Sequence, residues 1–441
     1  MLKNQQYNNN NNNGLMDKDF NESIKGDFLI SNKKIYLNNG SVGPLPLSTI
    51  KSITDFNLRY SEQGPDSKEF NEYLDKLKKE TRKRLSDLLN CSADEIIFTQ
   101  STTEGINYIT NGICWKKNEK IIVRNPKNEH YSNYLPWIKV ANDKNLKIDK
   151  FPIEKENLTL DDLKNSINAK KPKIVTTSHI MYNNGSITPV EEIGKILKDN
   201  NKDILFSIDG AQSVGAINVD VKKIKCDFLS FPAFKWICGP LGIGILYVNK
   251  KVLDKEFIPT FIGSGTAKIV KKIESKNNSK NFLDAKESKI IDNRNEIQEE
   301  EIDYYNYPEK YHATFRNYPG LAGLESSLRY ILRLGVSNIY KKNKRLSNLF
   351  REEIIKIKDI VIHEGNNEEY RSSMICFSFK HNNNNKVGIL VERLEEKGII
   401  LAEREIGIKK IVRASPHFYN TEEEIIKTTD EIKSILTRFE S

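Results

Sequence analysis

The middle of the sequence repeats one unit, a short apolar run followed by a turn and a helical pattern. This alternation predicts strands joined by helical crossovers, and therefore a parallel sheet with helices on its faces. Most of the runs lack alternating polar residues, as strands that are buried on both faces do. The runs occupy residues 95–98, 120–125, 173–178, 204–209, 226–232 and 242–248.

The sequence after Tyr311 has a different texture, in which long amphipathic helices precede a strand and a last helix. We therefore expect an α/β fold with two parts: a large domain on a mostly parallel central sheet flanked by helices, and a smaller C-terminal α+β domain. The smaller domain would occupy residues 311–441, with helices at 320–334 and 339–357, a strand at 374–379 and a helix from Glu422.

Two polar segments lie outside this pattern. Residues 1–26 contain the run Asn8 to Asn13, which cannot bury apolar surface, so we expect a disordered tail there. Residues 267–303 are also rich in charged and amide side chains and are expected to form a polar surface insertion. The N-terminal segment and the large domain would then cover residues 27–310.

Charge and hydropathy exclude several classes of protein. The 441 residues include 69 Lys and Arg against 60 Asp and Glu, and the resulting charge of +9 is spread along the chain. We therefore expect no nucleic-acid partner. No apolar run approaches the roughly 20 residues that cross a bilayer. Because the first residues also lack the apolar core of a secretory signal, we expect a cytoplasmic protein with no membrane partner.

The cysteines do not predict a disulfide framework. They are odd in number and widely spaced, and no two of them form a CxxC pair. We therefore expect reduced thiols and no metal site. They are Cys91, Cys114, Cys226, Cys238 and Cys376.

Polar residues that directly follow the predicted strands form the candidate site, because ligands of open parallel sheets bind beyond the carboxyl ends of the strands. Thr102 and Thr103 open a helix after the first run, where free N–H groups can bind a phosphate. An ordinary helix cap is the alternative. His130 follows the second run, either as a ring that stacks on a planar ligand or as a structural histidine.

Two further runs end in ionisable residues. Asp209 closes the fourth run and Gln212 follows three residues later, with a capping role as the alternative for Asp209. Lys235 follows the fifth run and precedes Trp236, in an apolar setting that favours the neutral amine. A phosphate cradle, a stacking ring, an acid for a ring nitrogen and an amine for a Schiff base together predict a pyridoxal-phosphate site.

Eight ordered sequence blocks then resemble a known family. The resemblance is to the class V aminotransferases, fold-type-I pyridoxal-phosphate enzymes that include cysteine desulfurases, kynureninase and isopenicillin-N epimerase, and it covers about residues 35–437. The blocks are IYLNNGSVGPLP, FTQSTTEGIN, NEHYSNYLPW, SHIMYNNGSITPVEEIG, SIDGAQSVGAINVDV, DFLSFPAFKWICGPLGIGILYV, YHATFRNYPGLAGL and VRASPHFYNTEEEI.

The resemblance assigns a role to each candidate residue. Lys235 would form the Schiff base with pyridoxal 5'-phosphate and move protons at the substrate Cα. The other cofactor contacts would be ring stacking by His130, pairing with the ring nitrogen by Asp209, hydrogen bonding to the ring hydroxyl by Gln212, and phosphate binding by Thr102 and Thr103.

The same resemblance implies how the substrate and a second subunit would bind. Arg413 would hold the carboxylate of an amino-acid substrate as a bidentate fork, with Arg404 as a weaker second candidate. Asn39 would lie near the substrate. A homodimer is implied as well, because residues 311–324 are similar to a family segment at the subunit interface.

The chain departs from the family pattern at several positions. Pro232, Ala233 and Phe234 stand where the family usually has Ser-Gly-His before the lysine. Thr314 and Phe315 align with a Gly-Thr pair that reaches the partner's phosphate. Tyr182 replaces an Asn that many members place against the ring hydroxyl.

A missing cysteine decides the expected reaction. Desulfurases attack substrate sulfur with a Cys on a loop before the carboxylate-binding Arg, and the link from Arg404 to Arg413 contains none. We therefore expect a transaminase-like enzyme that acts on an amino acid. The alternatives are an isopenicillin-N-epimerase-like epimerase, a cysteine or selenocysteine lyase, and an inactive binding or scaffold protein with the same fold.

Overall fold

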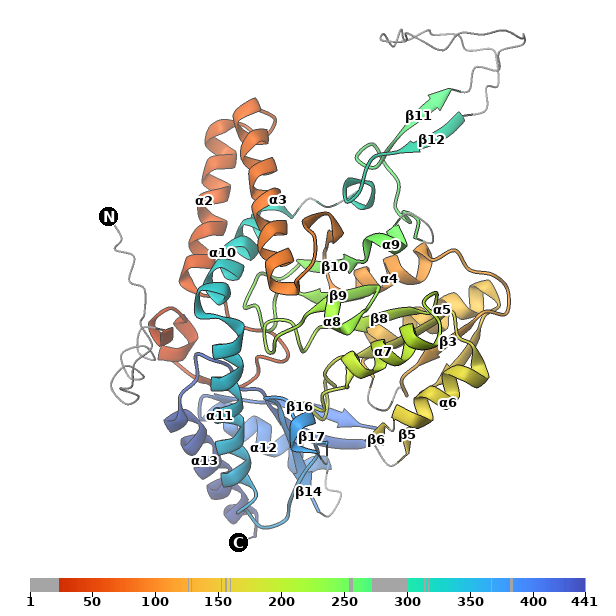
Figure 1. The fold of residues 1–441 in the computed structure, drawn as a ribbon. Coiled ribbons are helices and arrows are strands. Elements are labelled where there is room, and N and C mark those ends of the chain that lie inside the picture. The colour runs from red at the N-terminus through yellow and green to blue at the C-terminus, as the bar shows by residue number, and fades with distance from the viewer. Residues whose placement is uncertain are drawn as a thin grey trace, which may run out of the picture.

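A computed structural model gives the fold of the chain (Figure 1). It describes residues 24–440 with several short gaps and one long one. The gaps are residues 126, 128, 152, 155–156, 159, 254–256, 272–299, 313–314, 316, 366 and 381–383. The predicted tail therefore lies outside the described residues except at residues 24–26, and so does Thr314.

A seven-stranded sheet forms the centre of the large domain, in the order β2-β10-β9-β8-β7-β3-β4 (Figure 1). Strand β10 is antiparallel to both of its neighbours, and the other pairs are parallel. The expected fold class is thereby confirmed. The strands are β2 (Ile96–Thr99), β3 (Lys120–Val123), β4 (Lys147–Lys150), β7 (Ile174–Ser178), β8 (Leu205–Asp209), β9 (Phe228–Pro232) and β10 (Gly244–Val248).

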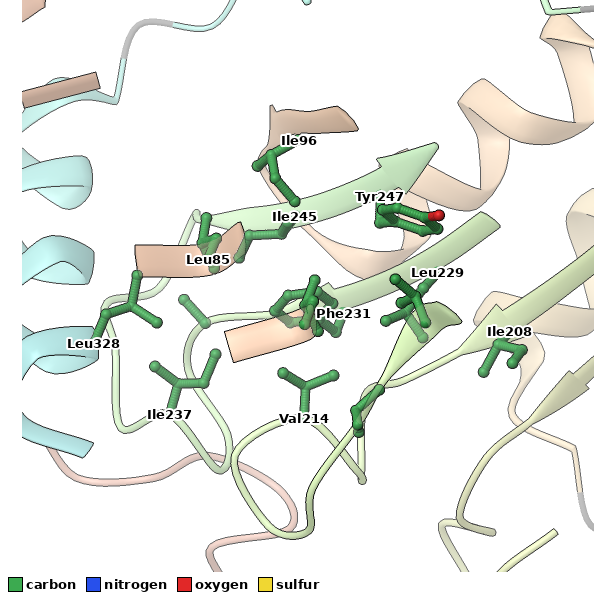
Figure 2. Close-up of a cluster of buried hydrophobic side chains, with 14 of the residues drawn as sticks. Leu85, Ile96, Ile208, Val214, Leu229, Phe231, Ile237, Ile245, Tyr247 and Leu328 are labelled. Atoms are coloured by element: carbon green, nitrogen blue, oxygen red, sulfur yellow. The ribbon is translucent and has the colours of Figure 1, made fainter. Parts of the chain in front are cut away.

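Two apolar cores cover the two faces of this sheet. Alternate residues of one strand enter different cores, as Ile96 and Phe98 join one and Ile97 the other. Both faces are dry, which is why the sequence runs show no polar alternation. Figure 2 shows side chains of the first core, where Phe231 and Ile245 of the sheet pack with Leu328. The large-domain helices are α4 (Thr102–Gly112), α5 (Tyr131–Lys144), α6 (Leu160–Lys170), α7 (Val190–Asn200), α8 (Val221–Ile224) and α9 (Lys250–Leu253).

Three long helices pack together beside the sheet (Figure 1). They are α2 (Leu47–Gln63), α3 (Lys68–Leu89) and α10 (Tyr318–Leu334). The Ser67 hydroxyl accepts a hydrogen bond from the Phe70 N–H and caps α3. Helix α10 contributes Leu321 and Leu328 to the same core as the sheet, so it joins the large domain's packing although it follows residue 311.

The C-terminal part contains a four-stranded antiparallel sheet in the order β13-β14-β17-β16. Its core also takes Leu37, because the N-terminal segment crosses to it and pairs β1 with β15 in parallel. Chain segments from both ends therefore meet in this part of the fold. Its elements are α11 (Val336–Ile354), β13 (Ile360–Ile362), β14 (Ile375–Phe379), α12 (Asn384–Glu396), β16 (Ala402–Ile406), β17 (Lys409–Ala414) and α13 (Glu422–Glu440), with β1 (Ile35–Tyr36) and β15 (Ile399–Ile400) beside them.

The predicted insertion at 267–303 begins and ends in paired strands. Strands β11 (Ala267–Lys271) and β12 (Glu300–Tyr304) form a hairpin that extends away from the body (Figure 1), and the residues between them lie outside the described residues. No described helix is both long and apolar enough to cross a membrane. The remaining short elements are β5 (Ile153–Glu154), β6 (Asn157–Leu158) and the 3-10 turns η1 (Leu29–Asn32), η2 (Ala93–Glu95), η3 (Glu309–Tyr311) and η4 (Glu368–Tyr370).

Helix α7 approaches α8 so closely that only glycine fits between them. A Cβ on Gly194 would lie 1.8 Å from the Ile224 carbonyl oxygen, which is backbone and cannot rotate away. We expect Gly194→Ala to lower the free energy of unfolding by about 1–3 kcal/mol, the usual cost of overpacking. Guanidinium unfolding followed by circular dichroism measures it. Gly263→Ala is the control, because nothing lies within 4 Å of its Cβ position; equal midpoints would contradict the packing.

Candidate active site

The candidate residues converge beyond the carboxyl end of the central sheet. Asp209 ends β8 and Lys235 follows β9, while His130 begins α5. The C-terminal sheet supplies Arg404 on β16 and Arg413 on β17. These groups are close enough to shift one another's pKa: Lys235 affects Asp209, and Lys235 and both arginines affect His130.

Asp209 is a buried acid with a second buried acid behind it. Its Oδ1 accepts the Ala211 N–H at 2.8 Å, the local contact that the capping interpretation predicted. Burial raises its pKa, the nearby Glu129 raises it further, and Lys235 opposes both effects. A positive charge beside Asp209, such as that of Lys235, therefore favours the ionised form of this carboxyl.

Glu129 was missed by the sequence analysis, although it stands next to His130 in a quoted block. It is buried and accepts the Ser178 N–H at 2.9 Å, the Ser178 hydroxyl and the His130 N–H at 3.1 Å. Burial raises the pKa of Glu129 while these donors lower it. Glu129 thus fixes the backbone at His130 and adds negative potential at Asp209.

Lys235 carries its amine into the same region. Burial lowers its pKa, and Arg413 and Arg404 add to that shift against the attraction of Asp209. The amine has no hydrogen-bond partner among the described residues. A lowered pKa increases the fraction of neutral amine, the form that adds to an aldehyde.

His130 has the structural role that was considered for it, and stacking on a planar ligand stays a prediction. Its Nδ1 accepts the Ser132 N–H at 3.1 Å and caps α5, so the proton of the neutral ring lies on Nε2. The ring stands edge-on to Tyr182 with 5.0 Å between centroids. Part of the side chain remains exposed, yet desolvation of the rest lowers its pKa to about 4, helped by the positive charges of Lys235 and the arginines. The imidazole is neutral at physiological pH.

At the start of α4, the helix cap and the candidate phosphate ligands are different residues. Ser101 caps the helix, since its hydroxyl accepts the Glu104 N–H at 3.1 Å. The Thr102 hydroxyl is consequently left buried without a partner in the described structure, and Thr103 is exposed. Buried hydroxyls without partners are rare in folded proteins and point to an absent ligand. A phosphate at a helix N-terminus would supply the missing bond.

Gln212 and Asn39 hold the chain around Lys235. The Gln212 Nε2 donates to the Gly40 carbonyl at 2.8 Å, and its Oε1 accepts the Trp236 indole N–H at 2.8 Å. Asn39 donates to the Lys235 carbonyl at 3.3 Å. The predicted role of Gln212 at a ring hydroxyl would use its second N–H, and the predicted place of Asn39 near substrate stays a prediction.

The two arginines lie together without a carboxylate partner. Arg413 is fully buried and donates to the Tyr182 carbonyl at 2.7 Å, and Arg404 donates to the Glu403 carbonyl at 2.6 Å. Both also donate to the hydroxyl of Ser41, a residue that the sequence analysis did not single out. Neither guanidinium forms an ion pair within the described part of the chain. Such a pair of cations suits an anionic ligand.

Comparison with known proteins identifies the family. The aminotransferase class-V family profile matches residues 35–286 and 288–427. The chain belongs to the class V aminotransferase family.

Several proteins similar to this chain are named cysteine desulfurases. A probable cysteine desulfurase of Pyrococcus abyssi is 30% identical over 420 residues, which cover 92% of this chain and 94% of that protein. The cysteine desulfurase of Thermococcus onnurineus NA1 superposes with a TM-score of 0.79 at 26% identity, covering 94% and 98% of the two chains. A C-DES mutant with glycine covalently linked to its pyridoxal-phosphate cofactor shares the fold, with a TM-score of 0.78 at 22% identity over 93% and 98%.

These findings confirm three expectations and overturn one. This class V protein is a pyridoxal-phosphate-dependent enzyme with the expected fold, so the interpretation as an inactive scaffold is set aside. The prediction of a transaminase-like reaction is wrong, because the relatives are named cysteine desulfurases. The prediction took the missing cysteine as a sign against the persulfide route of desulfurases and kept a cysteine or selenocysteine lyase only as an alternative. A lyase, however, can cleave a carbon–sulfur bond without an enzyme thiol, and that alternative fits the relatives.

Burial and the positive charges of Lys235, Arg404 and Arg413 predict a low pKa for His130. We expect histidine NMR spectra to place its pKa at about 4 instead of the ordinary 6.5. Arg404→Ala should raise this pKa, because removing a positive neighbour makes the imidazolium easier to form. His130→Gln assigns the resonance by its disappearance. A wild-type midpoint near the ordinary value, unmoved by Arg404→Ala, would show that the ring lies away from these positive charges.

Proposed function

We propose that this class V enzyme cleaves the carbon–sulfur bond of cysteine or of a cysteine derivative by β-elimination. The observation that carries the proposal is the half-buried Lys235, whose charge interacts with that of the buried Asp209, together with two guanidiniums on the neighbouring sheet that form no ion pair among the described residues. The relatives named cysteine desulfurases support cysteine as the substrate class. Lys235, Asp209, His130 and Thr102 are the residues that would hold the cofactor.

Bound pyridoxal phosphate supplies an electron sink for negative charge at the substrate Cα. The chain's own residues do the rest. Arg413 binds the substrate carboxylate and orients the Cα–H bond toward Lys235, whose neutral amine takes that proton. The electron pair left at Cα forms the Cα–Cβ double bond, and the Cβ–S bond breaks with its electrons leaving on sulfur. Addition of water then yields pyruvate and ammonia.

Elimination is favoured over a persulfide route by the state of the thiols. Only a thiolate attacks sulfur efficiently. Cys238 and Cys376 are nearest to the site, but both are fully buried, and burial raises the pKa of both thiols, that of Cys376 to about 12. Cys114 is exposed but follows the opposite end of α4 from Thr102, roughly 16 Å away at 1.5 Å per residue.

The products of cysteine turnover test this proposal. We expect the loaded enzyme to release equal amounts of pyruvate, ammonia and sulfide, measured by a coupled lactate dehydrogenase assay and by sulfide trapping. Lys235→Ala should lower the rate at least 10²-fold, the low end of what a general base contributes. Borohydride reduction followed by peptide mapping should place the cofactor adduct on Lys235.

The other outcomes are equally informative. Alanine together with a persulfide on one of the five cysteines would overturn elimination while keeping cysteine as substrate. Lys76→Ala is the matched control, since that side chain is exposed on α3 and pairs only weakly with Glu80 on the same helix, and should leave turnover unchanged. Absence of any cysteine turnover would refute the proposed substrate class.

We infer further that the enzyme is a homodimer. Val42 and Tyr131, which follow Ser41 and His130 in the sequence, are 39% and 66% exposed, and Leu241, six residues after Lys235, is 65% exposed. Exposed apolar surface around a ligand site marks an interaction surface, and a two-fold dimer would cover it twice.

A charge at this surface should weaken the dimer. We expect sedimentation equilibrium to give twice the chain mass for the wild type. Leu241→Glu should shift it toward monomer, because association would bury an unpaired carboxylate. Ile355→Glu, at a position 69% exposed beyond α11, should not. A wild-type monomer would contradict the inference.

A further inference from the structure

Ser41 lies where the two arginines of the site meet. Its hydroxyl accepts hydrogen bonds from the Nη2 atoms of Arg413, at 2.7 Å, and of Arg404. The serine belongs to the loop between β1 and α2, and the arginines to β17 and β16, more than 360 residues along the chain. One neutral side chain thus joins two cations from the opposite end of the sequence.

The hydroxyl of Ser41 is fully used by this arrangement. A serine hydroxyl offers one donor and two acceptor positions. The donor goes to Asn38 Oδ1 at 2.6 Å, and the two acceptor positions go to the two guanidiniums. Because Asn38 takes the proton, the lone pairs of the oxygen are directed at the arginines.

The loop that carries Ser41 is fixed from both sides of the site. The Gly40 N–H donates to the Ser415 hydroxyl at 2.9 Å, and the Gly43 N–H donates to the Phe234 carbonyl at 2.6 Å, next to Lys235. No side chain fits at Gly43, since a Cβ there would lie 2.4 Å from the Lys235 carbonyl oxygen. Ser41 therefore has a set position relative to the lysine and to β17.

The arginines need such a holder because they repel each other. Each is desolvated, and Arg404 contributes to lowering the pKa of Arg413 to about 9, after burial. Arg413 is held by a second contact to the Tyr182 carbonyl, whereas the second contact of Arg404 among the described residues is to the carbonyl of its own neighbour Glu403. Without Ser41, repulsion would turn Arg404 toward solvent. The Arg413 Nε is buried and has no hydrogen-bond partner in the described part of the chain, so it is available to a ligand.

We propose that Ser41 is a positioning residue that holds Arg404 inward beside Arg413, so that both guanidiniums are presented together to the carboxylate of the substrate. The inference rests on the proposed function, in which Arg413 binds that carboxylate. It adds that Arg404 takes part in the same anion site and that its orientation is set before the ligand arrives. A pre-oriented pair loses less side-chain freedom on binding.

Equilibrium binding tests the proposal without turnover. The probes are 3-mercaptopropionate and 3-mercaptopropanol, which share a thiol chain, lack the amine that would react with the cofactor, and differ in the carboxylate. Isothermal titration calorimetry of the loaded full-length enzyme gives both dissociation constants. We expect Ser41→Ala to raise the dissociation constant of 3-mercaptopropionate roughly 3- to 10-fold, as expected for one newly freed side chain. The dissociation constant of 3-mercaptopropanol should stay unchanged.

Further variants separate positioning from a general structural effect. Ser41→Thr keeps the hydroxyl and should restore most of the carboxylate preference, while Asn38→Ala frees the hydroxyl to rotate and should give an intermediate loss. Ser61→Ala is the control, since that hydroxyl donates to the Asn57 carbonyl of its own helix. An equal loss of affinity for both probes in Ser41→Ala, or no loss of affinity for either probe, would overturn the proposal.

Failure of the proposal and failure of the proposed function give different results. If the wild type binds 3-mercaptopropionate no better than 3-mercaptopropanol, the carboxylate site itself is wrong and the proposed function falls with it. If the wild type prefers the carboxylate and Ser41→Ala keeps that preference in full, only the role of Ser41 is refuted.

Discussion

Desolvation of charged groups at the end of the central sheet is the constraint on which the site depends. Two acids, Asp209 and Glu129, and three cations, Lys235, Arg404 and Arg413, stand where water is largely excluded. Unpaired buried charge is costly, so each group shifts toward its neutral form or requires an opposite charge nearby. An incoming carboxylate and a phosphorylated, protonatable ring would bring the missing charges. Binding of such groups would offset part of the desolvation cost of the charged side chains.

The second constraint is that the site is assembled from segments that lie far apart in the sequence. Its acid and lysine come from β8 and β9, its arginines from the C-terminal sheet, and the loop 38–43 lies between them. The N-terminal segment crosses to the C-terminal core before α2 begins, which brings Ser41 to the arginines. Any movement of the two parts relative to each other would therefore change the anion site first, because Ser41 and Arg413 are bonded across that boundary.

Features that depend on neighbouring residues could be predicted from the sequence, whereas features that depend on contacts between distant residues could not. Buried strands such as β8 and β9 were predicted within two residues, because both of their faces are dry and the sequence shows it locally. Glu129, Ser41 and the contacts of Gln212 could not be read in this way, since their roles depend on partners 49, 372 and 172 residues away. The hairpin of β11 and β12 was hidden by the charged composition of its strands, whose paired residues are partly solvated.

The reaction class was harder to predict than the site for a related reason. A base, an acid and an anion site are needed by every reaction that starts with loss of the Cα proton, and these are the residues that buried strands and their ends position. What happens at Cβ depends on the side chain of the substrate and on one or two further groups beside Arg413, such as Tyr182 and Arg404. A missing cysteine in the short link between Arg404 and Arg413 removes one acceptor for sulfur. It does not remove Lys235, the proposed base for the Cα–H bond, and once that bond is broken a sulfur at Cβ is a sufficiently good leaving group to depart unaided.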